Sequence, residues 1–126
     1  MKISIMVTIL LLLIITSVYG LYFYTAQLCQ DIDDLLIQLN DHVKEEDWEA
    51  ATTKTEKLKE QWDHADFFWS TFVDHKEIDF VDESVARIAL LVKIKKSDEL
   101  LVEIGLARRF IYRIKENETP DLQSVF

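Results

Sequence analysis

Hydrophobic and polar residues follow two different patterns along this chain, and the change falls near residue 25. Before it, the run from Ile3 to Tyr24 contains no charged side chain. After it, apolar residues recur every three or four positions, which is the spacing of one face of an α-helix. No glycine or proline separates the run from the first stripe, so we expect one rod-like helix from about Ile3 to Val43. The members of that first stripe are Leu28, Ile32, Leu35, Leu39 and Val43.

The second stripe has the most regular spacing in the chain. Its members alternate steps of three and four: Trp48, Ala51, Thr55, Leu58, Trp62, Ala65, Trp69 and Phe72. This is the seam of a heptad repeat, and Asp47 precedes it as a predicted N-cap. Trp48, Trp62 and Trp69 share one heptad position because they are spaced by 14 and 7 residues. Such an aromatic stripe is either a ligand platform or part of the core, and its helical spacing favours the core.

Two more stripes complete the pattern. One consists of Val81, Val85, Ile88 and Val92, and the other of Leu100, Ile104, Ala107, Ile111 and Ile114. Four amphipathic helices joined by a few residues predict an all-α fold, an antiparallel four-helix bundle into which the N-terminal transmembrane helix continues. An extended pair of hairpins is the alternative. The expected divisions are a transmembrane anchor (1–24), an extracytoplasmic bundle (25–116) and a C-terminal tail (117–126).

The uncharged run is 22 residues long, enough to cross the hydrocarbon core of a bilayer as a helix. Tyr19, Tyr22 and Tyr24 stand at its end, where amphipathic rings favour the membrane interface. Lys2 precedes the run and only acidic residues follow it closely, so the positive-inside rule predicts a single-pass protein of the cell membrane. Its N-terminus would be cytoplasmic and its C-terminal domain extracytoplasmic.

A secretory signal peptide cleaved after Gly20 is the competing interpretation of this run. Three features favour an uncleaved anchor instead. The apolar run is longer than the usual core of a signal peptide, a single lysine precedes it, and no polar break follows Gly20.

Composition narrows the possible functions. Two glycines and one proline in 126 residues argue against glycine-rich phosphate loops and many-stranded sheets. A single cysteine, Cys29, excludes an intrachain disulfide and a zinc site built from cysteine pairs. Leu28 before it departs from the small residue of a lipoprotein signal, so we expect Cys29 to be a small buried hydrophobe. The net charge of −9 disfavours nucleic acid or an anionic lipid surface as the main partner.

The stretch WSTFVDHKEIDFVDES, from Trp69 to Ser84, contains the residue types of a metal or acid–base site. A metal ion needs at least three converging ligands, but the histidines at positions 42, 64 and 75 are spread over two predicted helices. We therefore interpret the stretch as a bend. In this interpretation His75 bonds the last carbonyls of the second helix and Asp79 caps the third. We expect no catalytic residue, metal or cofactor, and hence no enzyme.

The chain resembles a family of short, N-terminally membrane-anchored helical proteins of unknown function from endospore-forming Firmicutes. The resemblance rests on the uncharged N-terminal span, on Trp48 and Ala51 at the opening of the second helix, on Trp62, and on HKEID from His75 to Asp79. It covers essentially the whole chain. It implies an extracytoplasmic helical domain encoded beside multi-pass membrane proteins, and no known activity.

The expected function is that of a membrane-anchored extracytoplasmic interaction module, an accessory subunit of an envelope or membrane protein complex. Its partners would be the lipid bilayer, through residues 3–24, and another membrane or envelope protein. The alternative is an extracytoplasmic sensor or small-ligand-binding bundle that uses the aromatic interior.

Overall fold

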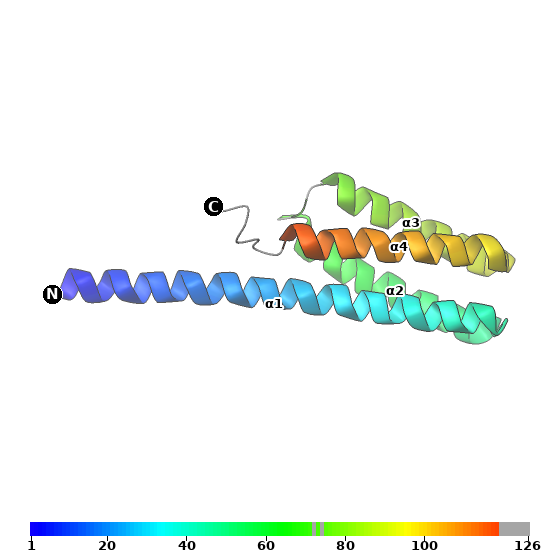
Figure 1. The fold of residues 1–126 in the computed structure, drawn as a ribbon, viewed down its shortest axis with the longest axis horizontal. Coiled ribbons are helices and arrows are strands. Elements are labelled where there is room, and N and C mark those ends of the chain that lie inside the picture. Colours follow the sequence, from blue (N-terminus) through cyan, green and yellow to red (C-terminus); the bar gives the residue numbers. More distant parts are fainter. Residues whose placement is uncertain (72, 74, 119–126) are drawn as a thin grey trace.

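The computed structural model describes residues 1–71, 73 and 75–118, and the regular structure among them is entirely helical. The four helices are α1 (Lys2–Lys44), α2 (Trp48–Trp69), α3 (His75–Ile94) and α4 (Ser97–Glu118). They form an antiparallel bundle in which α1 packs on α2 and α4, and α3 packs on the same two helices from the opposite corner (Figure 1). The predicted all-α fold is confirmed.

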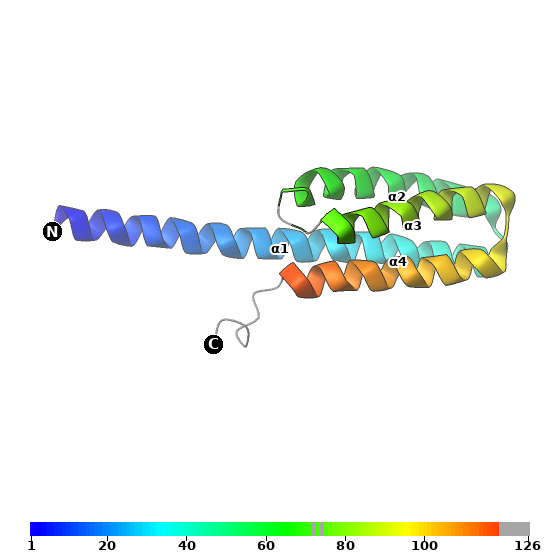
Figure 2. The same ribbon diagram turned by 90° about the horizontal axis from the view of Figure 1, so that it is seen from above.

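Helix α1 is uninterrupted, as the lack of a breaker predicted. Its C-terminal half packs in the bundle, whereas its N-terminal half projects from it, with every residue up to Leu21 exposed (Figure 2). The helix is long and apolar enough to cross a membrane, although a signal sequence shares these properties. One member of the predicted stripe is shifted: Leu36 is buried and Leu35 is half-buried against the core. Because α1 contacts two helices, its buried face is wider than a single stripe.

Helix α2 begins and packs as its heptad seam predicts. The Asp47 side chain accepts a hydrogen bond from the backbone N–H of Ala50 at 3.2 Å, which confirms the N-cap. Trp62 and Trp69 are 1% and 0% exposed, and their ring centroids are 6.1 Å apart. Trp48 is half-buried against the same core. The predicted seam residue Phe72 lies outside the described residues.

The bend between α2 and α3 lies earlier than predicted. Helix α3 begins at His75, so Asp79 occupies its second turn and the prediction that it caps the helix is wrong. Two of the last carbonyls of α2 accept hydrogen bonds from backbone groups. The backbone N–H groups of Ser70 and Val73 donate to the carbonyl oxygens of Asp66 and Trp69 at 2.9 and 2.8 Å.

The core stripe of α3 explains this earlier start. Val81, Val85, Ile88 and Val92 are buried as predicted, and Ile78, three residues before Val81, is buried as well. The same helical face therefore extends one step further toward the N-terminus, and a helix that buries Ile78 has to begin before Asp79.

Helix α4 buries all five residues of its predicted stripe. It continues to Glu118, whereas the tail was expected from residue 117, and the remainder of that tail lies outside the described residues.

Two of the turns place non-glycine residues in the left-handed region of backbone conformation. Glu46, between α1 and α2, has φ 57°, and Lys95, between α3 and α4, has φ 58°. At each turn the residue after the left-handed one donates its backbone N–H to a helical carbonyl: Asp47 to His42 at 2.9 Å, and Lys96 to Leu91 at 3.1 Å. This bonding is the Schellman motif, which favours glycine at the left-handed position because a Cβ is disfavoured there.

We predict that Glu46→Gly stabilises the bundle by about 1 kcal/mol, since it relieves the left-handed backbone of a side-chain-bearing residue. The matched control is Glu45→Gly, which removes the same charge at a residue with φ −82° and should destabilise instead. Urea unfolding of the full chain in detergent, followed by circular dichroism, measures both. Equal effects of the two variants would contradict this explanation of the turn.

We also predict that Trp62→Ala lowers the free energy of unfolding by about 3–5 kcal/mol, because it opens a cavity in the core. It also removes the hydrogen bond that the indole Nε1 donates to Asp82 at 3.1 Å. Trp48→Ala, at the same heptad position but half-buried, should cost clearly less. The same unfolding measurement compares the two variants, and an unchanged unfolding midpoint for Trp62→Ala would show that the ring is not core.

Candidate interaction surface

The exposed apolar side chains of the bundle gather on α3 and α4. Beyond residue 37, the described large hydrophobic residues that are exposed lie on these two helices, with the exception of Phe67 at the end of α2. Those on α3 and α4 are Phe80, Leu90, Ile94, Val102, Leu106 and Tyr112. Two of them, Leu90 and Val102, line one hollow. Adjoining exposed apolar side chains mark a binding face more often than scattered single residues do.

The surface is hollowed between the C-terminal part of α3 and the N-terminal part of α4. Leu90 and Val102, which are 62% and 65% exposed, stand on its two sides. The hollow has a volume of about 440 Å³, and its lining residues are Arg87, Leu90, Leu91, Glu99, Val102 and Glu103. Further along the same helix pair, the rings of Phe80 and Phe110 stack with centroids 5.5 Å apart. We call the hollow and its apolar rim the α3–α4 groove.

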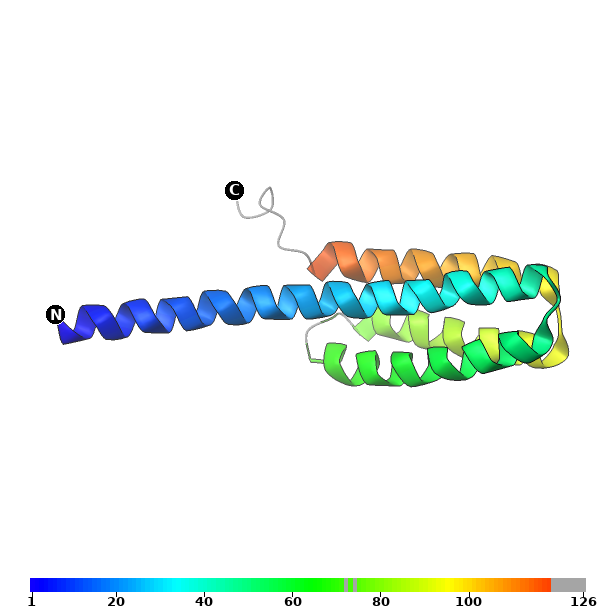
Figure 3. The same ribbon diagram turned by 90° about the horizontal axis from the view of Figure 1, so that it is seen from below.

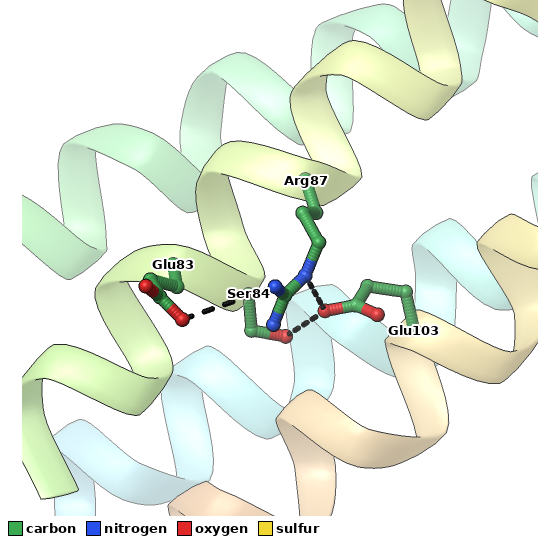
Figure 4. A network of polar contacts seen from close by, with 4 residues as sticks. All are labelled: Glu83, Ser84, Arg87 and Glu103. Atoms are coloured by element: carbon green, nitrogen blue, oxygen red, sulfur yellow. Dashed lines mark hydrogen bonds and ion pairs between the residues drawn. The ribbon is translucent and has the colours of Figure 1, made fainter.

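A polar network lies at the base of the α3–α4 groove (Figure 4). The Glu103 carboxylate, which is nearly buried, accepts hydrogen bonds from Ser84 Oγ at 3.0 Å and from Arg87 Nε at 2.9 Å, both on Oε1. On the other side, Arg87 Nη1 lies 3.8 Å from Glu83 Oε2. The hydrogen bond to Glu103 raises the pKa of Arg87 above its usual value. The two carboxylates therefore more than balance the Arg87 charge, and they hold its guanidinium in place beside the hollow.

Sequence reasoning did not find this groove, although its signal is present. On α3, Phe80, Arg87, Leu90 and Ile94 form a second stripe beside the core stripe. A second apolar stripe on an amphipathic helix predicts that a second face packs against another element. The tertiary structure shows that no described element packs against this one.

The residues singled out from the sequence are not brought together into one site. Trp62 and Trp69 are core, whereas His75 and Asp79 lie exposed on the first two turns of α3. His64 Nε2 lies 2.8 Å from the Tyr24 hydroxyl. Among the residues that the structure describes, no three His, Cys, Asp or Glu side chains are placed to hold a metal ion.

Carboxylates crowd the end of the bundle where α2 meets α3. Partial burial raises the pKa of Asp66, and the negative charges of Asp82, Asp63 and Asp79 raise it further. One of these groups has a structural partner, since Asp82 accepts the indole hydrogen bond of Trp62. These carboxylates therefore repel one another at the surface, and they do not form an acid–base pair.

Cys29 lies on α1, outside the α3–α4 groove. It is buried, as expected, and burial raises the pKa of its thiol to about 12, so the thiol stays protonated. It lines a hollow of about 310 Å³ between α1 and α4. Arg108 at the edge of this hollow is already held by Asp33, through hydrogen bonds of 2.7 Å from Nε and 3.3 Å from Nη2.

These features define a class of protein: an all-helical bundle, carried on a long apolar N-terminal helix, with a groove on one helix pair that no described element covers. The chain belongs to the family described as Domain of unknown function (DUF4363), whose pattern matches residues 19–125. The resemblance to a family of unknown function is thereby confirmed. No curated protein and no solved structure matches the chain.

We predict that Glu103→Ala lowers the free energy of unfolding by about 1–3 kcal/mol, because the buried Ser84 hydroxyl loses its acceptor. Glu83→Ala, which removes the other carboxylate beside Arg87 at an exposed position, should cost about 0.5 kcal/mol or less. Denaturant unfolding of the full chain compares them. If the hydroxyl is the cause, adding Ser84→Ala to Glu103→Ala should recover part of the loss; a further loss in the double variant would contradict that cause.

Proposed function

We propose that this protein is a membrane-anchored extracytoplasmic interaction module, an accessory subunit that binds another membrane or envelope protein through the α3–α4 groove. The observation that carries the proposal is the groove itself, an exposed apolar hollow with a fixed arginine at its edge. Apolar area provides the driving force for association, and the charge restricts which partner fits.

The anchor is supported by the projecting half of α1. Its 22 uncharged residues from Ile3 to Tyr24 are almost all exposed, and water is a poor solvent for such a surface. A bilayer removes this apolar surface from water, because the hydrocarbon core accommodates an apolar helix of this length. Lys2 before the run and acidic residues after it favour a cytoplasmic N-terminus and an extracytoplasmic bundle.

The position of the groove suits a partner outside the bilayer. The Asp33–Arg108 ion pair sets the register of antiparallel α1 and α4, so Val102 lies level with Leu39. Leu39 is 15 residues past Tyr24, which corresponds to about 22 Å along a helix. In addition, α3 has no contact with α1 among the described residues, so the groove faces away from the anchor.

The chemistry of the groove favours an amphipathic helix as the bound element. Leu90 and Val102 provide the walls that accept aliphatic side chains at helical spacing. The Arg87 side chain is 53% accessible, so its guanidinium still has donors for a hydrogen-bond acceptor of the partner. We infer a partner helix that carries a hydrogen-bond acceptor within an apolar stripe.

The test places a photo-crosslinking amino acid at position 90 of the full chain in native membranes. We expect one adduct of defined mass, absent when the same amino acid stands at Thr53, an exposed position of α2. Arg87→Glu should reduce the adduct about tenfold, as expected for loss of a charge-assisted contact. Arg109→Glu, the same charge change at an exposed position outside the groove, should leave it unchanged.

Alkaline carbonate washing of the same membranes tests the anchor separately, because an integral protein stays with the pellet. A chain that stays in the pellet but gives equal adducts at positions 90 and 53 would reject the groove as the binding face. A chain released by carbonate would reject the anchor.

A further inference from the structure

The end of the bundle from which α1 projects is built from three helix termini. The end of α2, the start of α3 and the end of α4 all lie beside the point where α1 leaves the bundle (Figures 2 and 3). Helix α2 is fixed there to the last residue of the uncharged run. The Tyr24 hydroxyl lies 2.8 Å from His64 Nε2, and the Tyr24 and Phe68 rings pack edge to face with centroids 4.6 Å apart.

These contacts place Phe67 level, along the bundle axis, with the end of the apolar run. Phe67 adjoins Phe68, so it lies within about 2 Å of the level of Tyr24 along the bundle axis. Its side chain is 85% exposed, the highest exposure of any described large hydrophobic residue past Tyr24. An aromatic ring at this height leaves water if the membrane interface surrounds it, as aromatic residues at the ends of membrane spans do.

The end of α4 brings charged residues of both signs to a similar height: Arg113, Lys115, Glu116 and Glu118. In the register set by Asp33 and Arg108, Arg113 lies level with Leu28 and Lys115 with Ala26. These levels are about 3–6 Å beyond Tyr24. The head-group layer extends about 5–7 Å beyond the hydrocarbon core, so both cations fall within it. Arg113 makes no ion pair with the described residues.

We propose that this end of the bundle rests on the outer surface of the bilayer that α1 crosses, with Phe67 inserted among the lipids and Arg113 on their head groups. The inference rests on the proposed anchor. The carboxylates of Asp63, Asp66, Asp79 and Asp82 belong to the α2–α3 side of this end. At the end of α4, Glu116 and Glu118 offset the charges of Arg113 and Lys115. The contact is therefore mainly the apolar insertion of Phe67, with Arg113 meeting a lipid phosphate. The bilayer is thus a second contact surface for the bundle, and it fixes the direction in which the groove faces.

The test uses the full chain in vesicles of phosphatidylcholine, with or without phosphatidylglycerol. Phe67→Cys carries an environment-sensitive fluorophore, and Thr53→Cys, exposed on the same helix nearer its N-terminus, is the matched control. The native Cys29 is buried, so it does not compete for the label. We expect a blue-shifted emission at position 67, quenched several-fold more by spin-labelled lipid than by aqueous iodide. The reverse is expected at position 53.

Arg113→Glu tests the contribution of the head groups. It should reduce lipid quenching at position 67 in vesicles that contain phosphatidylglycerol and change it little in phosphatidylcholine alone. Iodide quenching at position 67 equal to that at position 53, in a chain that withstands alkaline carbonate, would overturn the resting contact and leave the anchor intact. Release of the chain by carbonate would overturn both.

Discussion

The continuity of α1 is the constraint on which the rest of the structure depends. One unbroken helix, Lys2–Lys44, provides both the projecting apolar half and one corner of the bundle core. Two of the other helices are positioned directly against it: α2 through Tyr24 and the heptad seam, and α4 through its buried stripe and the Arg108–Asp33 pair. A break near residue 25 would uncouple the bundle from the apolar segment. With the helix intact, the bundle has one fixed orientation relative to that segment.

That orientation separates two surfaces of different chemistry. The end around the exit of α1 presents Phe67 and the charged terminus of α4, whereas the distal part of α3 and α4 presents the aliphatic groove with Arg87. Helix α3 touches α2 and α4 but not α1 in the described part of the chain, so it occupies the corner farthest from the projecting helix. If α1 spans a membrane, the first surface faces lipid and the second faces the space above it.

The polar contacts differ between these two parts of the bundle. Ser84, Arg87 and Glu103 join α3 to α4 beneath the groove, because a nearly buried carboxylate requires donors. Repulsion acts instead among the carboxylates near the start of α3, where burial and neighbouring charges raise the pKa of Asp66. Protonation of Asp66 relieves that repulsion and therefore stabilises the folded state. This contribution to the free energy of unfolding grows as the pH falls toward the pKa of Asp66 and is lost as the pH rises above that pKa.

The sequence by itself determined the helices and most of the core. Periodicity placed Trp62, Ile88 and Ile104 inside, because burial against neighbours demands one apolar face per helix, and Asp47 marked a helix start through local chemistry. It misplaced the α2–α3 bend, because His75 and Asp79 look like capping residues whereas the burial of Ile78 requires an earlier start. Only the tertiary structure decided which second stripes remain uncovered and which distant groups meet. Arg87 bonds Glu103, and Tyr24 bonds His64, because antiparallel packing sets the register between neighbouring helices. The periodicity within one helix carries no information on that register.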